Sequence, residues 1–300
     1  MRVNPNMVPD VLAGLQQTQS AVNTALQEVS TGKSVSVPSD NPAASASMVQ
    51  NTIETSDVDQ YTQNTSSVLS MVQTADSTLS SVVSSLTKAV SLGTEGANGT
   101  MSAADQQSIA TEVQGILSSV VSMANTTYQG SYLFGGTAST QAPYTADSSS
   151  ASGYTYNGNN GVNSVVVGDD LTVQANIPGS QIFSNSSNDV LGSLSSLVRA
   201  LQSGNTSSIQ SATNAVNSSL NYVSQQRVTY GNVETQLNSQ ETYLQQETVT
   251  LTSQENSLVG VDTAKAATAL AQAQTANSAA LAAASKAIPT TLLNYLVPTQ

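Results

Sequence analysis

The sequence of 300 residues contains no histidine, no cysteine and no tryptophan. Without cysteine the chain can form neither a disulfide nor a thiolate metal site. Without histidine it lacks the commonest general base and the commonest metal ligand of proteins. These absences argue against most hydrolases and metalloenzymes. We therefore expect a protein that is not an enzyme and that carries no cofactor.

Positive charge is also scarce. Seven Lys and Arg residues stand against nineteen Asp and Glu, which gives a formal net charge of −12 although only 9% of the residues are charged. An acidic chain without a basic run is poorly suited to bind nucleic acid or an anionic membrane surface. We expect neither partner.

Long apolar runs are missing as well. No stretch approaches the roughly 18 apolar residues of a membrane-spanning helix, and Ala279–Ala284 is too short and too mild to form one. The N-terminal residues Met1–Met7 contain no apolar segment of the length found in a secretory signal peptide. We expect a chain that stays in the cytosol or that leaves the cell without a cleaved signal.

Aromatic residues make up only 4% of the sequence and hydrophobic residues 38%. A thick globular core is therefore not expected for much of the chain. Ser, Thr, Asn, Gln and Ala occupy many of the remaining positions, and these residues suit helices that share narrow seams.

Both ends of the chain carry apolar residues at alternating spacings of three and four. The N-terminal stretch is Met7–Val29 and the C-terminal stretch is Tyr222–Ile288. In the second, one set recurs every seven residues: Val223, Tyr230, Leu237, Leu244, Leu251 and Leu258. Heptads of this kind are typical of helices that pack along a seam. We expect the terminal helices to pair as a long antiparallel coiled coil or bundle.

Spacing and punctuation predict further helices in the N-terminal half. A first helix over residues 7–31 ends at Gly32, and a turn-rich segment through Pro38 and Pro42 follows. A second helix is predicted over about 43–91 and a third over 103–127, with glycines at 93, 96 and 99 as the turn between them. The short connection favours an antiparallel hairpin of these two helices.

The pattern changes at Gly130. Alternating residues predict short strands around 154–156, 164–167 and 171–173, with Gly168–Asp170 as a hairpin turn. Helix is predicted again over 189–201 and almost continuously over 207–288, with weak points at Gly231 and Gly260. The predicted fold class is mainly α with a small β insert.

These elements suggest three regions. Residues 1–44 and 261–300 form a terminal coiled-coil region, residues 45–129 and 187–260 form a helical rod, and residues 130–186 form a small β-rich domain.

Two patterns could still suggest chemistry. Ser30 with Lys33 and Ser85 with Lys88 match a Ser-x-x-Lys spacing, but two matches are expected by chance in so Ser-rich a chain, and no companion motif accompanies them. Asp169-Asp170 could ligate a metal, but a polar hairpin turn explains the pair better. We find no candidate catalytic, cofactor-binding or metal-binding set.

Several segments, in order, resemble the bacterial flagellin family. The N-terminal part reads Ser-Thr-Gly-Lys at residues 30–33 and then Pro-Ser-Asp-Asn-Pro at residues 38–42. The middle reads Tyr-Leu-Phe-Gly-Gly-Thr at residues 132–137, and residues 261–296 are similar to the closing helix of flagellins. Lys265, where an acidic residue is common, and Pro289 depart from the family pattern. The family-motif turn comprises Gly32, Pro38, Ser39, Asp40, Asn41 and Pro42.

The resemblance implies a structural role in the bacterial flagellum. Filament flagellins usually read Ala-x-Asp-Asp-Ala-Ala-Gly where this chain has residues 39–44 with Pro42. The proline version is similar to members that join the hook to the filament, and the filament subunit is the alternative. Either role implies an extracellular location at the flagellum, and export in an unfolded state without a cleaved signal.

The resemblance also implies partners and contacts. The partners are further copies of the chain in a helical layer, a neighbouring hook-associated protein, flagellin, the flagellar export apparatus and a chaperone. The terminal helices would form the inner layer and the β-rich domain would face outward. We expect α-helical packing of Leu12, Leu15, Val22 and Leu26 against Leu270, Leu281 and Ile288. The predicted assembly residues are these seven together with Leu292 and Leu293.

Overall fold

The computed structural model describes residues 7–296, with side chains described for residues 9–286. The chain divides into two compact units. Unit 1 combines Met1–Asp57 with Glu247–Gln300, and unit 2 is Val58–Gln246. The three regions expected from the sequence remain a prediction about the assembled protein.

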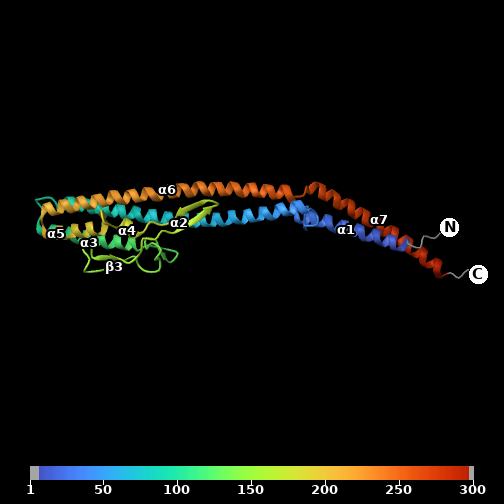
Figure 1. Ribbon diagram of the computed structural model, residues 1–300, viewed down its shortest axis with the longest axis horizontal. Coiled ribbons are helices and arrows are strands. Elements are labelled where there is room, and N and C mark those ends of the chain that lie inside the picture. Colours follow the sequence, from blue (N-terminus) through green and yellow to red (C-terminus); the bar gives the residue numbers. More distant parts are fainter. Residues whose placement is uncertain (1–6, 297–300) are drawn as a thin grey trace, which may run out of the picture. The chain divides into compact units, whose positions relative to one another are not determined.

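Helices dominate both units (Figure 1). Their bounds are α1 Met7–Thr31, α2 Pro42–Gly96, α3 Ala103–Ala124, α4 Gly179–Ile182, α5 Val190–Ser203, α6 Thr206–Val259 and α7 Thr263–Leu296. The predicted mainly α fold with a small β insert is confirmed. The first predicted helix matches α1 at both of its ends.

The long C-terminal helix predicted over 207–288 is interrupted at Gly260, one of its two predicted weak points. Helix α6 ends at Val259 and α7 begins at Thr263. The Asp262 side chain accepts hydrogen bonds from the backbone N–H groups of Ala264 at 3.0 Å and Lys265 at 3.1 Å. This carboxylate satisfies two donors that would otherwise lack partners at the start of α7. Gly231, the other weak point, lies inside α6 without a break.

In unit 2 the helices α2, α3, α5 and α6 share a hydrophobic core, to which residues of the β insert also contribute. The predicted antiparallel hairpin of α2 and α3 is confirmed by two contacts. Lys88 Nζ lies 2.6 Å from Glu112 Oε1, and the Gln106 amide donates to the carbonyl of Gly96 at 3.0 Å. Heptad residues Val223, Tyr230 and Leu237 of α6 are buried in this core, as their spacing predicts.

The β insert consists of antiparallel pairs of short strands. The pairs are β1 Thr127–Tyr128 with β2 Ser131–Tyr132, β3 Tyr144–Ala146 with β4 Tyr154–Tyr156, β5 Ser164–Gly168 with β6 Leu171–Gln174, and β7 Ser184–Asn185 with β8 Asn188–Asp189. The predicted hairpin is β5–β6. The amides of Asn64 in α2 and Gln240 in α6 donate to its backbone carbonyls at Val166 and Val167, at 2.8 and 2.9 Å.

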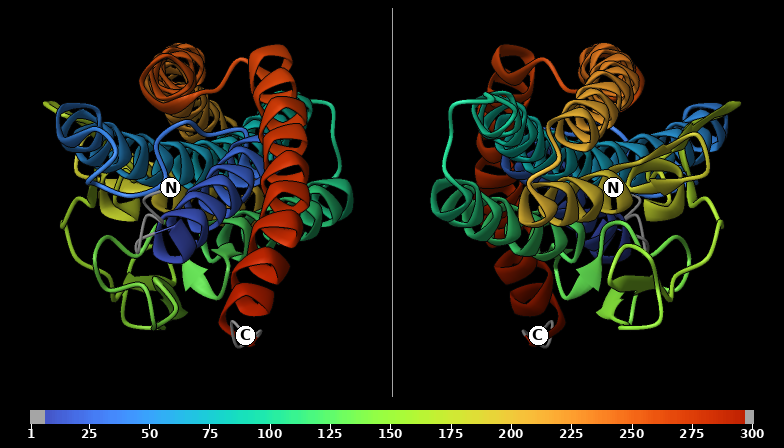
Figure 2. Two further views of the ribbon diagram at one scale, coloured as in Figure 1. Left: turned by 90° about the vertical axis from the view of Figure 1, so that its right-hand side faces the viewer. Right: turned by 90° about the vertical axis from the view of Figure 1, so that its left-hand side faces the viewer.

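Within unit 1, α1 and α7 run side by side in opposite directions (Figures 1 and 2). Among the described residues no helix combines the length and the apolar character needed to cross a membrane.

Candidate assembly surface

The seam between α1 and α7 is narrow and made largely of small residues. Its inward positions recur at spacings of three and four, as in a coiled coil. On α1 these positions are Val11, Leu15, Thr18, Val22 and Ala25, and on α7 they are Ala266, Leu270, Ala273, Asn277, Ala280 and Ala284. Four of the six α7 positions are Ala, so the two backbones can approach closely.

A polar layer crosses the middle of this seam. The Thr18 hydroxyl lies 3.1 Å from Asn277 Oδ1, and the Asn277 amide donates to Gln19 Oε1 at 3.2 Å. A polar pair at an inward position satisfies its own hydrogen bonds only when the two helices are in this register. The layer therefore favours one alignment of α1 with α7.

The predicted assembly leucines fall into two groups. Leu15, Val22 and Leu270 are half-buried in the seam. Leu12, Leu26 and Leu281 lie outside it, with exposed fractions of 54%, 53% and 51%. The expected packing of these three within the chain is not found, because the seam runs through neighbouring smaller residues. The side chains of Ile288, Leu292 and Leu293 lie outside the described residues.

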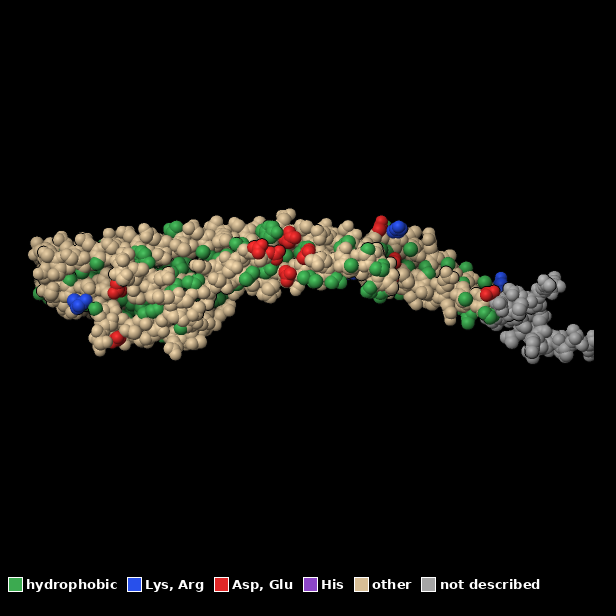
Figure 3. All heavy atoms as spheres, viewed as in Figure 1, with side chains coloured by type: hydrophobic (Ala, Val, Ile, Leu, Met, Phe, Trp, Pro, Cys, Tyr) green, Lys and Arg blue, Asp and Glu red, His purple; other side chains and the backbone are tan. Residues whose placement is uncertain are grey.

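Exposed apolar side chains also occur elsewhere in unit 1. Val29 and Val37 are 38% and 49% exposed, and Val49 and Ile53 on α2 are 61% and 51% exposed. Figure 3 shows hydrophobic side chains interspersed among uncharged polar ones over much of the visible face. Exposure of large apolar side chains to water is unfavourable, so these side chains are candidates for burial against another subunit.

The family-motif turn is built by side-chain hydrogen bonds to backbone groups. Gly32 ends α1 in the left-handed conformation, with a φ of 70°, which glycine adopts without a steric cost. Asp40 Oδ2 accepts from the N–H groups of Ser36 at 3.1 Å and Val37 at 3.0 Å. These bonds close the turn that holds Pro38 and Ser39, both of which are exposed.

Asn41 and Pro42 start α2. The Asn41 side chain accepts from the N–H of Ala44 at 3.1 Å, which is the bond of a helix N-cap. Pro42 is the first residue of the helix, where its fixed φ is favourable and its missing N–H has no cost. The Asp-Asn-Pro order of the motif thus has a local structural reason.

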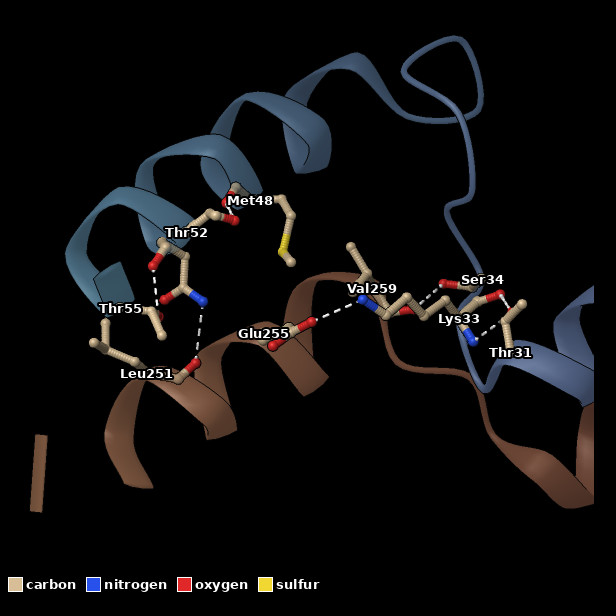
Figure 4. Close-up of polar contacts among 10 residues, drawn as sticks. Thr31, Lys33, Ser34, Met48, Thr52, Thr55, Leu251, Glu255 and Val259 are labelled. Atoms are coloured by element: carbon tan, nitrogen blue, oxygen red, sulfur yellow. Dashed lines mark hydrogen bonds and ion pairs between the residues drawn. The ribbon is translucent and has the colours of Figure 1, made fainter. Parts of the chain in front are cut away.

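The two breaks in the helices, after α1 and after α6, lie together (Figure 4). The Ser34 N–H donates to the carbonyl of Val259 at 2.7 Å, and the Val261 N–H donates to the carbonyl of Gly32 at 3.0 Å. Lys33 Nζ lies 2.8 Å from Glu255 Oε1. These contacts tie the end of α6 and the linker that leads to α7 to the segment that follows α1.

Nearby, Asn51 joins α2 to α6 within unit 1. Its amide donates to the carbonyl of Leu251 at 3.2 Å, while its Oδ1 is buried and has no hydrogen-bond partner. Among residues 9–286 no three acidic side chains are grouped so that they could hold a metal ion. The features of unit 1 are therefore those of helix packing and turn formation.

The sequence predicts that small residues suit narrow helix seams, but it does not predict which Ala residues lie inward or that a polar layer crosses the seam. The signal for both is the spacing of three and four at residues 266, 270, 273, 277, 280 and 284, which becomes visible when Ala and Asn are counted as inward residues.

Curated relatives that match the chain in part include a hook-associated protein and a flagellin. Flagellar hook-associated protein 3 of Escherichia coli K12 is 31% identical over 137 residues, which are 45% of this chain and 43% of the relative. Flagellin of Listeria monocytogenes is 26% identical over 128 residues, which are 42% of this chain and 45% of the relative. The chain thus spans less than half the length of the curated relatives that it matches.

Solved structures share the fold. The flagellar junction protein FlgL of Legionella pneumophila superposes with a TM-score of 0.60 at 14% identity, over 71% of this chain and all of that one. At this identity the likeness concerns the fold alone.

The family profiles match both ends. The bacterial flagellin N-terminal helical region matches residues 4–139 and the C-terminal helical region matches residues 213–296. Together they cover well over half of the chain, including all of α1 and α7. The stretch between them contains three of the four strand pairs. With paired terminal helices, an N-capped Asp-Asn-Pro turn and both helical regions matched in order, the chain belongs to the bacterial flagellin family.

Proposed function

We propose that this chain is the structural protein that joins the hook of a bacterial flagellum to its flagellin filament. The observation that carries the proposal is the α1–α7 pair, which leaves Leu12, Leu26 and Leu281 exposed on helices that match the flagellin termini. Burial of each of these side chains against a neighbouring subunit would contribute about 1–2 kcal/mol.

The junction role is favoured over that of a filament subunit by two observations. The match to hook-associated protein 3 of Escherichia coli has a higher identity than the match to flagellin of Listeria monocytogenes. The Ser39–Pro42 turn also has the proline that starts α2, in the form similar to junction members. Filament flagellin is the second candidate.

The proposed mechanism is mechanical and needs no catalysis. Copies of the chain pack head to tail around a helical layer, an arrangement that continues instead of closing on itself as a dimer does. One side of the layer contacts a neighbouring hook-associated protein, and the other side templates the first flagellin subunits. The chain reaches this extracellular position through the flagellar export apparatus, unfolded and with a chaperone, without a cleaved signal.

Gene deletion in the source bacterium tests the proposal. We expect cells that build hooks, lack filaments and release flagellin into the medium. Complementation with the full chain should restore filaments, and complementation with a chain that lacks residues 285–300 should not.

Two results would overturn the junction role. Filaments of normal length on the deletion strain would show that the chain is not needed there. Bare hooks with no flagellin in the medium would instead identify the chain as the filament subunit.

A further inference from the structure

The turn between α2 and α3 contains an Asn-Gly step at Asn98-Gly99. Two further Asn-Gly steps occur in the β insert, at Asn157-Gly158 and Asn160-Gly161. An asparagine before glycine can lose its side-chain amide when the glycine nitrogen attacks the side-chain carbonyl carbon. The three steps share the same dipeptide, so differences in their surroundings decide which one reacts.

At Asn98 the attacking nitrogen is free. Asn98, Gly99 and Thr100 are all exposed, and among the described residues the Gly99 N–H makes no hydrogen bond. A Cβ built on Gly99 would meet no atom within 4 Å. The backbone at this step therefore has room to move toward the side chain.

The Asn98 side-chain oxygen is held by two donors. The Thr100 N–H lies 3.2 Å and the Thr100 hydroxyl 3.0 Å from Asn98 Oδ1. Attack on the carbonyl carbon moves negative charge onto this oxygen. Donors already aimed at the atom that gains charge stabilise the transition state, which is the principle of an oxyanion hole.

Each of the other two steps lacks one of these features. At Asn160-Gly161 the Ser180 hydroxyl donates to Asn160 Oδ1 at 2.5 Å, but the Gly161 N–H donates to Asn159 Oδ1 at 3.0 Å, so the attacking nitrogen is engaged. At Asn157 the side-chain nitrogen donates to Thr145 Oγ1 at 2.7 Å, and no donor contacts its Oδ1 among the described residues.

We propose that Asn98 is a site of spontaneous, structure-directed deamidation. The Gly99 nitrogen gives its proton to a base and forms a bond to Asn98 Cγ, the Cγ–Nδ2 bond breaks, and ammonia leaves with a proton from solvent. The resulting succinimide is then opened by water at either carbonyl, which yields aspartate or isoaspartate at position 98. No redox partner or cofactor takes part.

The product would change the end of the α2–α3 hairpin. It adds one negative charge close to the end of α2, where the Asn98 N–H bonds the carbonyl of Glu95 at 3.0 Å. The isoaspartate form also lengthens the backbone by one carbon, which displaces the bond from the Met101 N–H to the Asn98 carbonyl, now 3.1 Å long. This turn would therefore age chemically before the rest of unit 2.

Peptide mapping of the purified full-length protein tests the proposal. The protein is incubated at mildly alkaline pH, cleaved after glutamate, and the peptide 96–112 is compared by mass spectrometry with the peptide that contains Asn157 and Asn160. We expect position 98 to convert several-fold faster than positions 157 and 160, with isoaspartate detected by enzymatic methylation. Equal or slower conversion at position 98 would overturn the proposal.

Variants distinguish the effect of the local structure on the deamidation rate from the effect of the Asn-Gly dipeptide itself. Gly99→Ala should nearly abolish the reaction at position 98, and it fits the fold because the added Cβ meets open space. Thr100→Val, which lacks the hydroxyl donor, should react more slowly than Thr100→Ser, which keeps it. In concentrated urea the three steps should react at similar rates. If Thr100→Val deamidates at position 98 as fast as the parent protein, or if position 98 still reacts fastest of the three in urea, the two donors do not direct the reaction.

Discussion

Arg227 of α6 and Asp76 of α2 form a two-pronged ion pair in unit 2. The guanidinium Nε and Nη2 lie 3.0 Å from the two carboxylate oxygens of Asp76. The side chains are 33% and 26% exposed, so solvent screens the pair only in part. The hydrogen bond to Asp76 raises the pKa of Arg227 above its ordinary value, and the guanidinium therefore stays charged.

We expect Arg227→Ala to lower the free energy of unfolding by about 1 kcal/mol, because a forked pair with restricted exposure is stronger than an ordinary surface pair. Arg227→Lys should recover only part of this, since an ammonium cannot bind both oxygens in the same way. Lys88→Ala, which removes a pair whose side chains are 60% and 46% exposed, is the matched control and should cost no more than about 0.5 kcal/mol. Urea denaturation measures all three, and an equal cost for Lys88→Ala and Arg227→Ala would contradict the prediction.

Tyr230 links α6 to the β insert. Its ring is 3% exposed and its hydroxyl accepts a hydrogen bond from the N–H of Ile177 at 3.1 Å. Tyr230→Phe should cost about 1 kcal/mol, because the Ile177 donor loses its acceptor while the ring still fills the core. The unfolding midpoint of the purified variant in urea measures this cost, and a midpoint equal to that of the parent protein would count against the bond.

The same residue predicts an alkaline effect. Burial raises the pKa of Tyr230, and of Tyr144, above the ordinary value of about 10. The unfolded chain therefore loses these phenol protons first as the pH rises. Their contribution to stability is complete below about pH 10 and is lost above it, up to the higher pKa of the folded state. Stability measured between about pH 8 and 11 should fall in the upper part of this range, and less steeply in Tyr230→Phe.

How far the sequence predicts this fold can be judged from its helix ends. The end of α1 is predictable, because Gly32 follows the last heptad position and supplies the left-handed conformation that ends the helix. The end of α2 is not. The glycines at 93 and 96 predict a turn after residue 91, but α2 continues to Gly96. Because glycine has no side chain, it is favourable both in a turn and where two helices pack closely, and the sequence alone does not distinguish the two.

The seam between α1 and α7 is also predictable only in part. Leucine spacing predicts that α1 and α7 pair, and they do. It does not predict that Leu12, Leu26 and Leu281 lie outside the seam while Ala and Asn277 lie inside. When most inward residues are small, the burial pattern depends on how closely the backbones approach, which a residue-by-residue hydrophobicity pattern does not contain.

The exposed leucines give a prediction that separates folding from assembly. Leu12→Ser and Leu281→Ser should change the stability of the isolated protein by less than about 0.5 kcal/mol, because both side chains are half-exposed and outside the seam. Under the proposed junction role, both should weaken filament growth and swimming in the complemented deletion strain.

Leu15→Ser and Leu270→Ser are the matched controls, since the same substitution is made at seam positions. Hydrogen exchange of the backbone amides of α1 should become faster in Leu15→Ser and Leu270→Ser and stay unchanged in Leu12→Ser and Leu281→Ser. If Leu12→Ser and Leu281→Ser cells swim normally, these two residues are not part of the assembly surface. The gene-deletion test of the junction role is independent of this result.

Gly93 provides the test of the close contact that ends α2. A Cβ at Gly93 would overlap the hydroxyl of Thr213 in α6 and lie 3.2 Å from Leu197 Cδ1 in α5. Gly93→Ala should therefore destabilise the protein by about 1–3 kcal/mol through overpacking, although alanine favours helix. Gly115→Ala, in a part of α3 where the added Cβ meets nothing within 4 Å, should instead stabilise it by up to about 1 kcal/mol. Opposite signs in the two thermal melts follow only if α2 is helical and tightly packed at Gly93. If Gly93→Ala stabilises the protein, Gly93 is not in a close helix contact, and the turn suggested by the sequence alone is the better description.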